Sequence, residues 1–284
     1  MGPTIGIIQA RMGSERLPGK ILAPLGGRPL LDRLVSRIMR ARVAQWWLAT
    51  SEHPSDDVTA AWGFELGLRV FRGAERDVLS RFLAIAAEAE ADWLVRVTAD
   101  NPFLDGILID HLLDARDAKS DAVGQADLVR HRGGIPLSET ASFASSAATA
   151  AATPTTAAAR GGSEGQSPHL PTGYGVELAR RAALEAAAQA IPPNAFHHRV
   201  HVTSWLATQG SVLEVPTPGD WPDRGHWRWT VDTEADLAMA RSAFRLFGYE
   251  AASIDYPTIV ARLDAQPEIP ALNAHVRQTA LEAG

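Results

Sequence analysis

The sequence contains no cysteine among its 284 residues. Disulfide bonds and thiolate metal sites are therefore excluded, and any metal must be held by oxygen or histidine ligands. A chain without cysteine also fits a reducing compartment, although it does not require one. We expect a cytoplasmic protein.

Long apolar runs and an excess of positive charge are also lacking. No stretch approaches the roughly 18 apolar residues of a membrane span, and the start of the chain does not have the pattern of a signal peptide. The 27 Lys and Arg residues stand against 33 Asp and Glu residues, a net charge of −6, which is poorly suited to a nucleic-acid backbone. We expect neither a membrane nor a nucleic-acid partner, so a bound anion must be met by a local cluster of cations.

Short apolar strands alternate with amphipathic helices along the chain. Strands are expected at 5–8, 46–50, 69–71, 92–98, 212–216 and 227–232. Helices are expected from residue 29, over 56–66, from 78, through 112–113, over 179–190, near 195–208 and over 234–247, the last beginning at a capping box of Thr233 and Asp236. This alternation predicts βαβ units and a mostly parallel sheet, whose ligands bind at the carboxyl ends of the strands.

The composition changes in the middle of the chain. Residues 141–170 are rich in Ala, Ser and Thr and too poor in large apolar residues to build a core. We interpret them as an inserted loop, with a short helix over 143–152 as the alternative. The organisation expected is one domain over 1–250 that contains this insert, followed by a helical, peripheral tail over 251–284.

The segment QARMGSERLPGK, residues 9–20, follows the first expected strand and is called the cation loop below. It is not a P-loop, because five residues separate its glycines and Ile follows its lysine; it also lacks G-x-G-x-x-G. Its cations Arg11, Arg16 and Lys20 suit a polyphosphate, and Gly13 and Ser14 allow a close approach of backbone donors. A solvated turn with surface salt bridges is the alternative.

The stretch IGIIQARMGSERLPGKILAPLGGRPLLDRLVSRI resembles the opening of the acylneuraminate cytidylyltransferase-like family, especially its spore coat polysaccharide biosynthesis branch. Later segments resemble that family's blocks in the same order: LATSEHPSDD, VFRGAERDVLSRF, VRVTADNPFLD, TGYGVEL and RWTVDTEADL. The resemblance implies a nucleotide-diphospho-sugar transferase fold, an α/β architecture with a mixed, mostly parallel sheet between helices. It also implies transfer of CMP from CTP to a sugar hydroxyl with release of pyrophosphate.

By this resemblance, Arg11 and Lys20 match positions that hold the triphosphate, Arg16 is a third candidate, and Asp100 and Asp232 match the metal-binding carboxylates. Charge that develops on a transferred phosphate is stabilised by fixed cations and by Mg²⁺, which takes only one or two protein carboxylates. Caps of turns or helices are the alternative roles of both aspartates.

Further contacts follow from the same resemblance. The nucleotide is expected to contact Ala10, Gly13, Ser14, Thr50, Ser51 and Arg72 as well, and the acceptor to contact Tyr174, Glu177 and His201. An ion pair of Arg72 with Asp77 that fixes a loop is an equal alternative. The family more often has Asp at the position of Gly175 and Glu at that of Val200, so the acceptor pocket departs from the family pattern.

We therefore expect a Mg²⁺-dependent cytidylyltransferase that uses CTP and a sugar-acid-like acceptor in surface polysaccharide or glycan synthesis. A glycosyltransferase of the same fold is an alternative, but it would normally carry two aspartates in a D-x-D motif, whereas TADNP has one. A non-catalytic nucleotide-sugar-binding protein would tolerate loss of both carboxylates, and both are present. A homodimer is an open possibility.

Overall fold

The computed structural model of the protein describes residues 2–118, 126–131 and 168–278. The two predictions for the Ala-rich insert, a loop or a helix over 143–152, therefore lie outside the described residues.

A seven-stranded sheet forms the centre of the fold, with the strand order β5-β4-β1-β6-β8-β7-β9. Its strands are β1 (Thr4–Gln9), β4 (Trp46–Ser51), β5 (Arg69–Gly73), β6 (Trp93–Thr98), β7 (Leu128–His131), β8 (Glu177–Arg180) and β9 (Val212–Val215). Strand β8 runs antiparallel to both of its neighbours, and the other pairs are parallel. The predicted mixed, mostly parallel sheet is confirmed.

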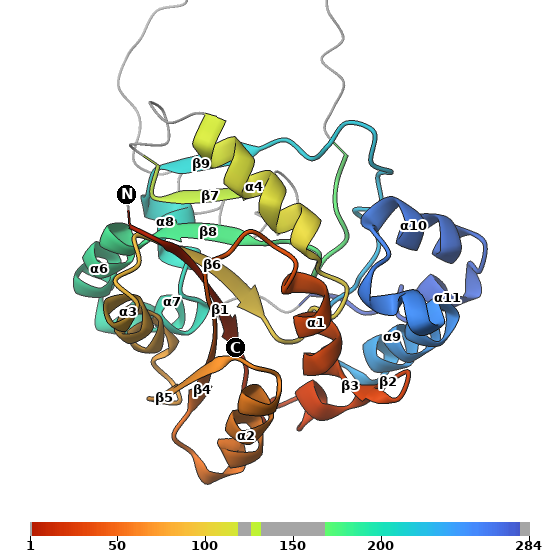
Figure 1. The fold of residues 1–284 in the computed structure, drawn as a ribbon, viewed down its shortest axis with the longest axis horizontal. Coiled ribbons are helices and arrows are strands. Elements are labelled where there is room, and N and C mark those ends of the chain that lie inside the picture. Colours follow the sequence, from red (N-terminus) through yellow and green to blue (C-terminus); the bar gives the residue numbers. More distant parts are fainter. Residues whose placement is uncertain (1, 119–125, 132–167, 279–284) are drawn as a thin grey trace, which may run out of the picture.

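Helices cover both faces of this sheet (Figure 1). One face carries α1 (Leu30–Ile38), α2 (Asp57–Glu65) and α4 (Gly106–Ala118), and the other carries α3 (Val78–Glu88), α6 (Arg181–Ala190), α7 (His197–His201) and α8 (Ser204–Gln209). Each face has its own cluster of buried apolar side chains. This is the three-layer arrangement that the resemblance implied.

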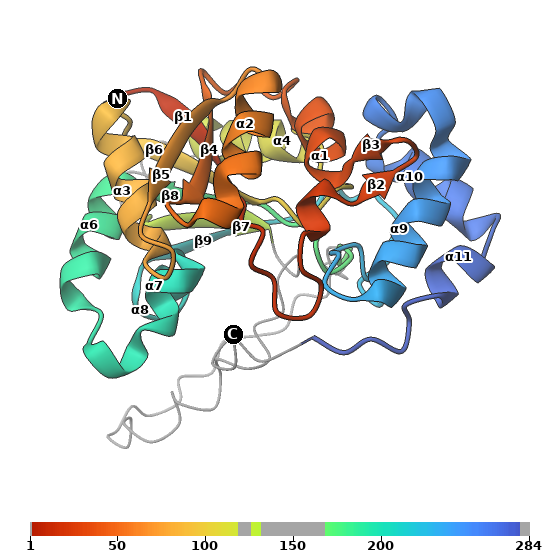
Figure 2. The same ribbon diagram turned by 90° about the horizontal axis from the view of Figure 1, so that it is seen from below.

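Short elements and three late helices complete the fold. They are the antiparallel pair β2 (Pro24–Leu25) and β3 (Arg28–Pro29), the 3₁₀ turns η1 (Lys20–Leu22), η2 (Pro54–Asp56), η3 (Pro193–Ala195) and η4 (Gly248–Ala252), and the helices α9 (Glu234–Phe247), α10 (Tyr256–Asp264) and α11 (Glu268–Ala271). The late helices gather beside α1, β2 and β3 at one end of the molecule (Figures 1 and 2).

Strand β1 lies in the middle of the sheet because its sequence allows close packing on both faces. Ile5, Ile7 and Ile8 are buried. Gly6 is required by the neighbouring strand, since a Cβ there would lie 2.2 Å from the ring of Trp46. Because β1 is packed inside the sheet, the cation loop that follows it begins at the carboxyl edge of the sheet.

The prediction of a strand over 227–232 is wrong. This segment makes one bridge, between Arg228 and Thr172, and otherwise crosses the end of the sheet. Trp229 and Val231 are fully buried, so the alternation typical of a strand arises from tertiary packing. The backbone N–H of Val231 donates to the carbonyl of Asp100 at 2.9 Å, which joins the segment before Asp232 to the segment after β6.

The single helix expected near 195–208 is two helices. Val202 separates α7 from α8 with φ 59° and ψ −65°, and the N–H of Thr203 donates to the carbonyl of His201 at 2.6 Å. These angles and this bond define a γ-turn, a conformation that is strained for a β-branched residue.

The late helices are not peripheral, which corrects the prediction for the tail. Tyr256, Ile259 and Leu263 of α10 are fully buried in the same apolar cluster as α1 and α4. The predicted capping box at Thr233 and Asp236 is present, and α9 begins there.

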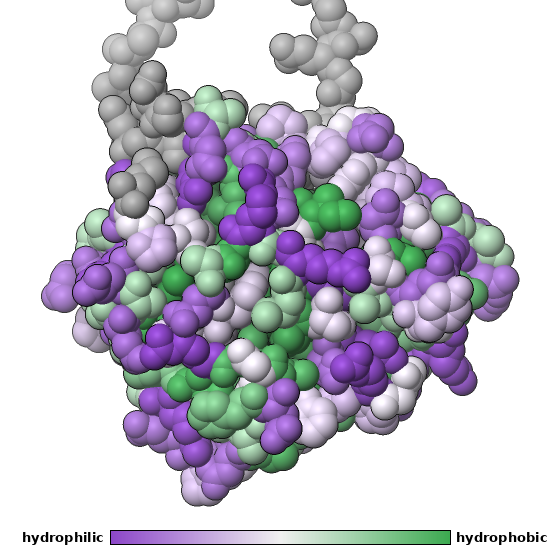
Figure 3. Space-filling view, viewed as in Figure 1, coloured by the Kyte–Doolittle hydropathy of each residue, from purple (hydrophilic) through white to green (hydrophobic). Residues whose placement is uncertain are grey.

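Hydrophobic side chains reach the surface in places. On the face that Figure 3 shows, they lie among hydrophilic residues, and one patch lies over α2, where Val58 and Phe64 are exposed. Within the described ranges, no helix is long and apolar enough to cross a membrane.

Candidate active site

A pocket of about 330 Å³ opens where β1 and β6 end. Its walls come from four parts of the chain. They include Gln9, Ala10, Arg11, Ser14, Glu15, Arg16 and Lys20 from the end of β1 and the cation loop, Arg96, Thr98 and Asp100 from β6 and its end, Val200 and His201 from α7, and Asp232 and Gln278 from the late segments.

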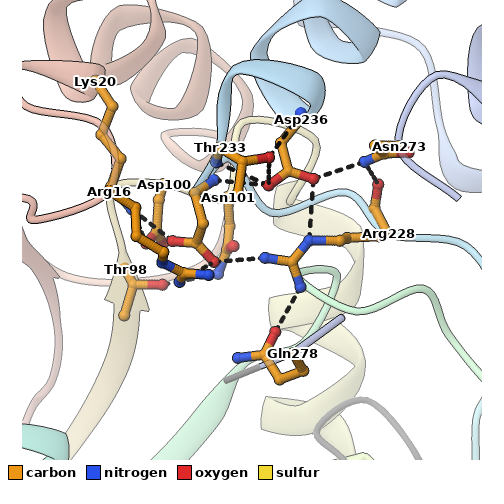
Figure 4. A network of polar contacts seen from close by, with 11 residues as sticks. Arg16, Lys20, Thr98, Asp100, Asn101, Arg228, Thr233, Asp236, Asn273 and Gln278 are labelled. Carbon is orange, nitrogen blue, oxygen red and sulfur yellow. Dashed lines mark hydrogen bonds and ion pairs between the residues drawn. The ribbon is translucent and has the colours of Figure 1, made fainter. Parts of the chain in front are cut away.

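Lys20 donates to both predicted metal carboxylates, Asp100 and Asp232. Figure 4 labels Lys20 and Asp100. Its Nζ is 2.8 Å from Oδ2 of Asp100 and 2.7 Å from Oδ1 of Asp232. Gly19 precedes it with φ 72°, a left-handed conformation that glycine adopts without strain and that starts η1. Arg16 adds a second contact, 3.2 Å from Oδ2 of Asp232. The cation loop, Asp100 and Asp232 lie far apart in the sequence, and the fold joins them.

Asp100 and Lys20 both stay ionised at neutral pH. Burial acts to raise the pKa of Asp100, but the charge of Lys20 and hydrogen bonds from Lys20 and Thr98 outweigh it and leave that pKa below its usual value. Burial likewise acts to lower the pKa of Lys20, but Asp100 and Asp232 outweigh it and raise that pKa. The site is therefore a fixed arrangement of opposite charges.

Asp100 and Asp232 are two carboxylates of the pocket that could hold a Mg²⁺ ion. Asp100 and Asp232 each place one oxygen within 2.8 Å of the same ammonium nitrogen, so the two carboxylates converge on one point. Among the described residues, no group of three or more His, Cys, Asp or Glu side chains could hold a metal. Two carboxylates alone suit a magnesium ion that takes its other ligands from phosphate and water.

Asp232 is held from behind by buried side chains. Arg228 donates from NH2 to Asp232 at 2.6 Å and from Nε to Asp236 at 3.0 Å. Asn273 donates to Oδ1 of Asp236 at 2.8 Å, and Gln278 accepts from NH1 of Arg228 at 2.5 Å (Figure 4). The end of the described chain thus supports the carboxylate.

The pocket brings together most of the residues predicted for the phosphates and the metal, with one residue predicted for the nucleoside and one predicted for the acceptor. Ala10, Arg11, Ser14, Arg16, Lys20, Asp100, His201 and Asp232 all line it. Gly13 lies outside its walls, and a Cβ there would lie 3.6 Å from Oε1 of Glu75.

The residues predicted to contact the nucleoside at the end of β4 are placed differently. Thr50 and Ser51 are fully buried, and the hydroxyl of Ser51 donates to Asp56. Arg72 donates from Nε to the carbonyl of Ser51 at 2.9 Å, and its NH1 pairs with Asp57 at 2.7 Å. None of the three predicted residues lines the pocket, and Arg72 pairs with Asp57 rather than with Asp77.

Two predicted acceptor contacts also need correction. Tyr174 is fully buried, and its hydroxyl donates to Asp105 at 2.8 Å inside the core, so a role in contacting the acceptor is wrong. Glu177 is 4% exposed, and its carboxylate accepts from Arg96 at 3.0 Å. Glu177 lies behind a residue of the pocket wall and is absent from the wall itself.

Sequence reasoning missed several residues of the wall. Gln9 and Thr98 are partners in the register of β1 and β6, and Arg96 lies two residues earlier on the same face. The sequence showed that Arg96 and Thr98 share a face of their strand, but it did not show which strands lie beside them. Gln278 carried no signal, because only tertiary folding returns the end of the chain to the pocket.

A family model described as Cytidylyltransferase matches residues 5–150. The chain belongs to this family. It is 43% identical over 127 residues to the spore coat polysaccharide biosynthesis protein SpsF of Bacillus subtilis, a match that covers 43% of this chain and 53% of that protein. It is 27% identical over 278 residues to the uncharacterized protein MJ1063 of Methanocaldococcus jannaschii, with 96% of each chain covered.

A third relative is the 3-deoxy-manno-octulosonate cytidylyltransferase of Trichlorobacter lovleyi, 30% identical over 112 residues, with 39% of this chain and 43% of that protein covered. The chain therefore spans only about half the length of SpsF and of this relative.

Solved structures share the fold. A cytidylyltransferase from Leptospira borgpetersenii matches with a TM-score of 0.75 and 22% identity over 99% of both chains. A CMP:2-keto-3-deoxy-manno-octonic acid synthetase complexed with CTP matches with a TM-score of 0.54 and 18% identity, over 86% of this chain and 99% of that one. At these identities the likeness shows a common nucleotidyltransferase fold.

Proposed function

We propose that this protein transfers CMP from CTP to a hydroxyl of a sugar-acid acceptor and releases pyrophosphate. The observation that carries the proposal is the position of Lys20 between Asp100 and Asp232, in a pocket that also contains Arg11 and Arg16. A cationic loop that faces a pair of carboxylates is what a triphosphate with a divalent cation requires.

In the proposed reaction, the acceptor hydroxyl attacks the α-phosphorus and loses its proton to the solvent, the new P–O bond forms, and the bond to pyrophosphate breaks. Arg11, Arg16 and Lys20 would hold the triphosphate and neutralise the charge that collects on the leaving pyrophosphate. Asp100 and Asp232 would hold Mg²⁺, which when bound supplies additional neutralisation of phosphate charge. Arg228 would keep Asp232 oriented, through the 2.6 Å bond described above.

The relatives support the choice of substrates. Several carry names that state cytidylyl transfer, and one of these names 3-deoxy-manno-octulosonate as the acceptor. SpsF is named for spore coat polysaccharide biosynthesis. We propose for this chain an acceptor of the same chemical class, in the synthesis of a surface polysaccharide or glycan, and the absence of cysteine supports a cytoplasmic location.

The test is pyrophosphate release from each of the four nucleoside triphosphates with Mg²⁺, against a panel of sugar acids. We expect release with CTP that depends on an acceptor and is lost in the variants Asp100→Ala and Lys20→Ala. The matched control is Arg42→Ala, which removes an exposed ion pair with Asp114 and leaves the pocket untouched. The proposal would be contradicted if release persisted in both pocket variants. It would also be contradicted if no combination of nucleotide and acceptor gave release.

A further inference from the structure

Arg96 is a cation of the pocket wall. The proposed transfer of CMP gives it no role. It lies on β6, and its side chain is only 14% exposed. Its NH1 donates to Glu177 at 3.0 Å. Its Nε is buried and has no hydrogen-bond partner among the described residues, which is unfavourable until an anion or a water satisfies it.

The backbone fixes the place of Arg96. Strands β6 and β8 are antiparallel, with Arg96 directly opposite Glu177, so the two side chains lie on the same face of the sheet. Glu177 is 4% exposed and also accepts from the hydroxyl of Thr203. Because Glu177 is held on both sides, it orients the guanidinium rather than competing with it for a ligand.

The γ-turn at Val202 completes this arrangement. It ends α7 directly after His201, which lines the pocket, and begins the segment in which Thr203 reaches Glu177. Val202 is fully buried, so core packing maintains a conformation that is otherwise unfavourable for a β-branched residue. Strain of this kind, held next to a pocket, is typical of a built binding wall.

Three other cations already form ion pairs with Asp100 or Asp232. Lys20 bridges Asp100 and Asp232, and both Arg16 and Arg228 contact Asp232. Arg96 has a different partner and lies on β6, four residues before Asp100 in the sequence. The pocket is therefore cationic at two places, and the second is separate from the phosphate-binding loop.

We propose that Arg96 is a specificity-determining residue that binds the carboxylate of the acceptor, and that Glu177 and Thr203 are its positioning residues. The inference rests on the proposed function and deepens it. Nε and one terminal nitrogen of a guanidinium form an edge with two parallel donors, which matches the two oxygens of a carboxylate. The resemblance assigned Glu177 to the acceptor, whereas the proposal gives this contact to Arg96, whose NH1 donates to Glu177.

The test compares two acceptors that differ only at the carboxyl group. The first is the sugar acid that supports pyrophosphate release from the wild type, beginning with 3-deoxy-manno-octulosonate, and the second is its carboxamide. Both are assayed with wild type, Arg96→Met, Arg96→Lys and Glu177→Gln. Arg69→Met is the matched control, because this arginine pairs with Glu88 at the surface of β5. Thermal unfolding of each variant shows whether it is folded.

In the wild type, we expect KM for the acid to be at least about tenfold lower than KM for the amide, as for a charge-assisted pair of hydrogen bonds. In Arg96→Met this difference should vanish while KM for CTP changes by less than about twofold. Arg96→Lys should keep part of the preference, since it keeps the charge but loses the paired donors. Glu177→Gln should reduce the preference with little change in kcat, which a merely structural role would not do.

An acid preference that survives in Arg96→Met, or an equal rise in KM for CTP, would overturn the assignment of Arg96 and leave the proposed function intact. If none of the acceptors in the panel supports pyrophosphate release by the wild type, the proposed function fails, and this inference fails with it. If Arg96→Met does not fold, Arg96→Lys and Glu177→Gln decide the question.

Discussion

Lys20 is the residue whose substitution tests the site most directly, because its Nζ contacts both carboxylates of the site. In Lys20→Ala, Asp100 and Asp232 lose a shared cation and the phosphates lose a donor. We expect kcat/KM for CTP to fall by roughly 100-fold or more, the scale for loss of one preorganised charge. Steady-state kinetics with CTP as the varied substrate measure it. A loss below about threefold would show that Lys20 is only a structural salt bridge.

Tyr174 provides the opposite case, a residue that the motif assigned to the acceptor and the structure buries. Burial raises the pKa of Asp105, although Arg37 and the hydroxyl of Tyr174 act against it. Tyr174→Phe removes one donor from a buried carboxyl, so we expect a loss of about 1–3 kcal/mol in the free energy of unfolding. Urea denaturation measures this loss. KM for the acceptor should be unchanged, and a large rise in that KM would reinstate Tyr174 as a contact.

At the scale of elements, a helix or strand could be predicted where neighbouring residues in the sequence determine it. The start of α9 followed from Thr233 and Asp236, three residues apart, and the structure begins the helix there. The segment 227–232 had strand-like alternation, but its pattern came from contacts with Thr172 and Asp100, which are distant in sequence. Sequence order alone could not reveal those contacts.

The candidate site follows the same division. The cation loop and both aspartates could be identified from motifs, because a loop that ends a strand carries its residues to one edge of the sheet. Arg96 and Gln278 were missed, since the role of one depends on the register of β6 with β8 and that of the other on the return of the chain after α11.

The segment after α11, which folds back to the pocket, gives a further prediction. Asn273 is 2% exposed and donates to both Asp236 and the carbonyl of Arg228. In Asn273→Ala we expect the free energy of unfolding to fall by about 1–3 kcal/mol. We also expect kcat to fall while KM for CTP stays near the wild-type value, because Arg228 orients Asp232. Urea denaturation and steady-state kinetics measure the two effects. The exposed control Leu272→Ala should change neither, and an unaltered kcat in Asn273→Ala would separate the late segment from the site.

At the scale of the whole molecule, stability should fall in acid because of a buried histidine pair. Burial lowers the pKa of His131 to about 3, with the nearby His111 acting in the same direction. An ordinary histidine, with a pKa of 6.5, takes up a proton in the unfolded chain well before His131 does in the folded protein. Between these values the unfolded state binds more protons, so stability decreases as pH falls from about 6.5 toward about 3.

His131→Phe should therefore show a weaker dependence of the free energy of unfolding on pH over this window. Urea denaturation at several pH values measures it, with the exposed His275→Gln as the matched control. Equal slopes in His131→Phe and the wild type would mean that His131 is protonated in the folded protein.

The central claim is that the pocket transfers CMP, which contains the α-phosphate of CTP, to an acceptor. The most direct measurement follows CTP labelled at the α-phosphate, with Mg²⁺ and a panel of sugar acids, in wild type and Asp232→Asn. The account predicts that the label enters one acceptor, that an equal amount of pyrophosphate is released, and that both are lost in the variant. Label that remains in CTP with every acceptor, or that appears as free CMP at the same rate without an acceptor, would contradict it.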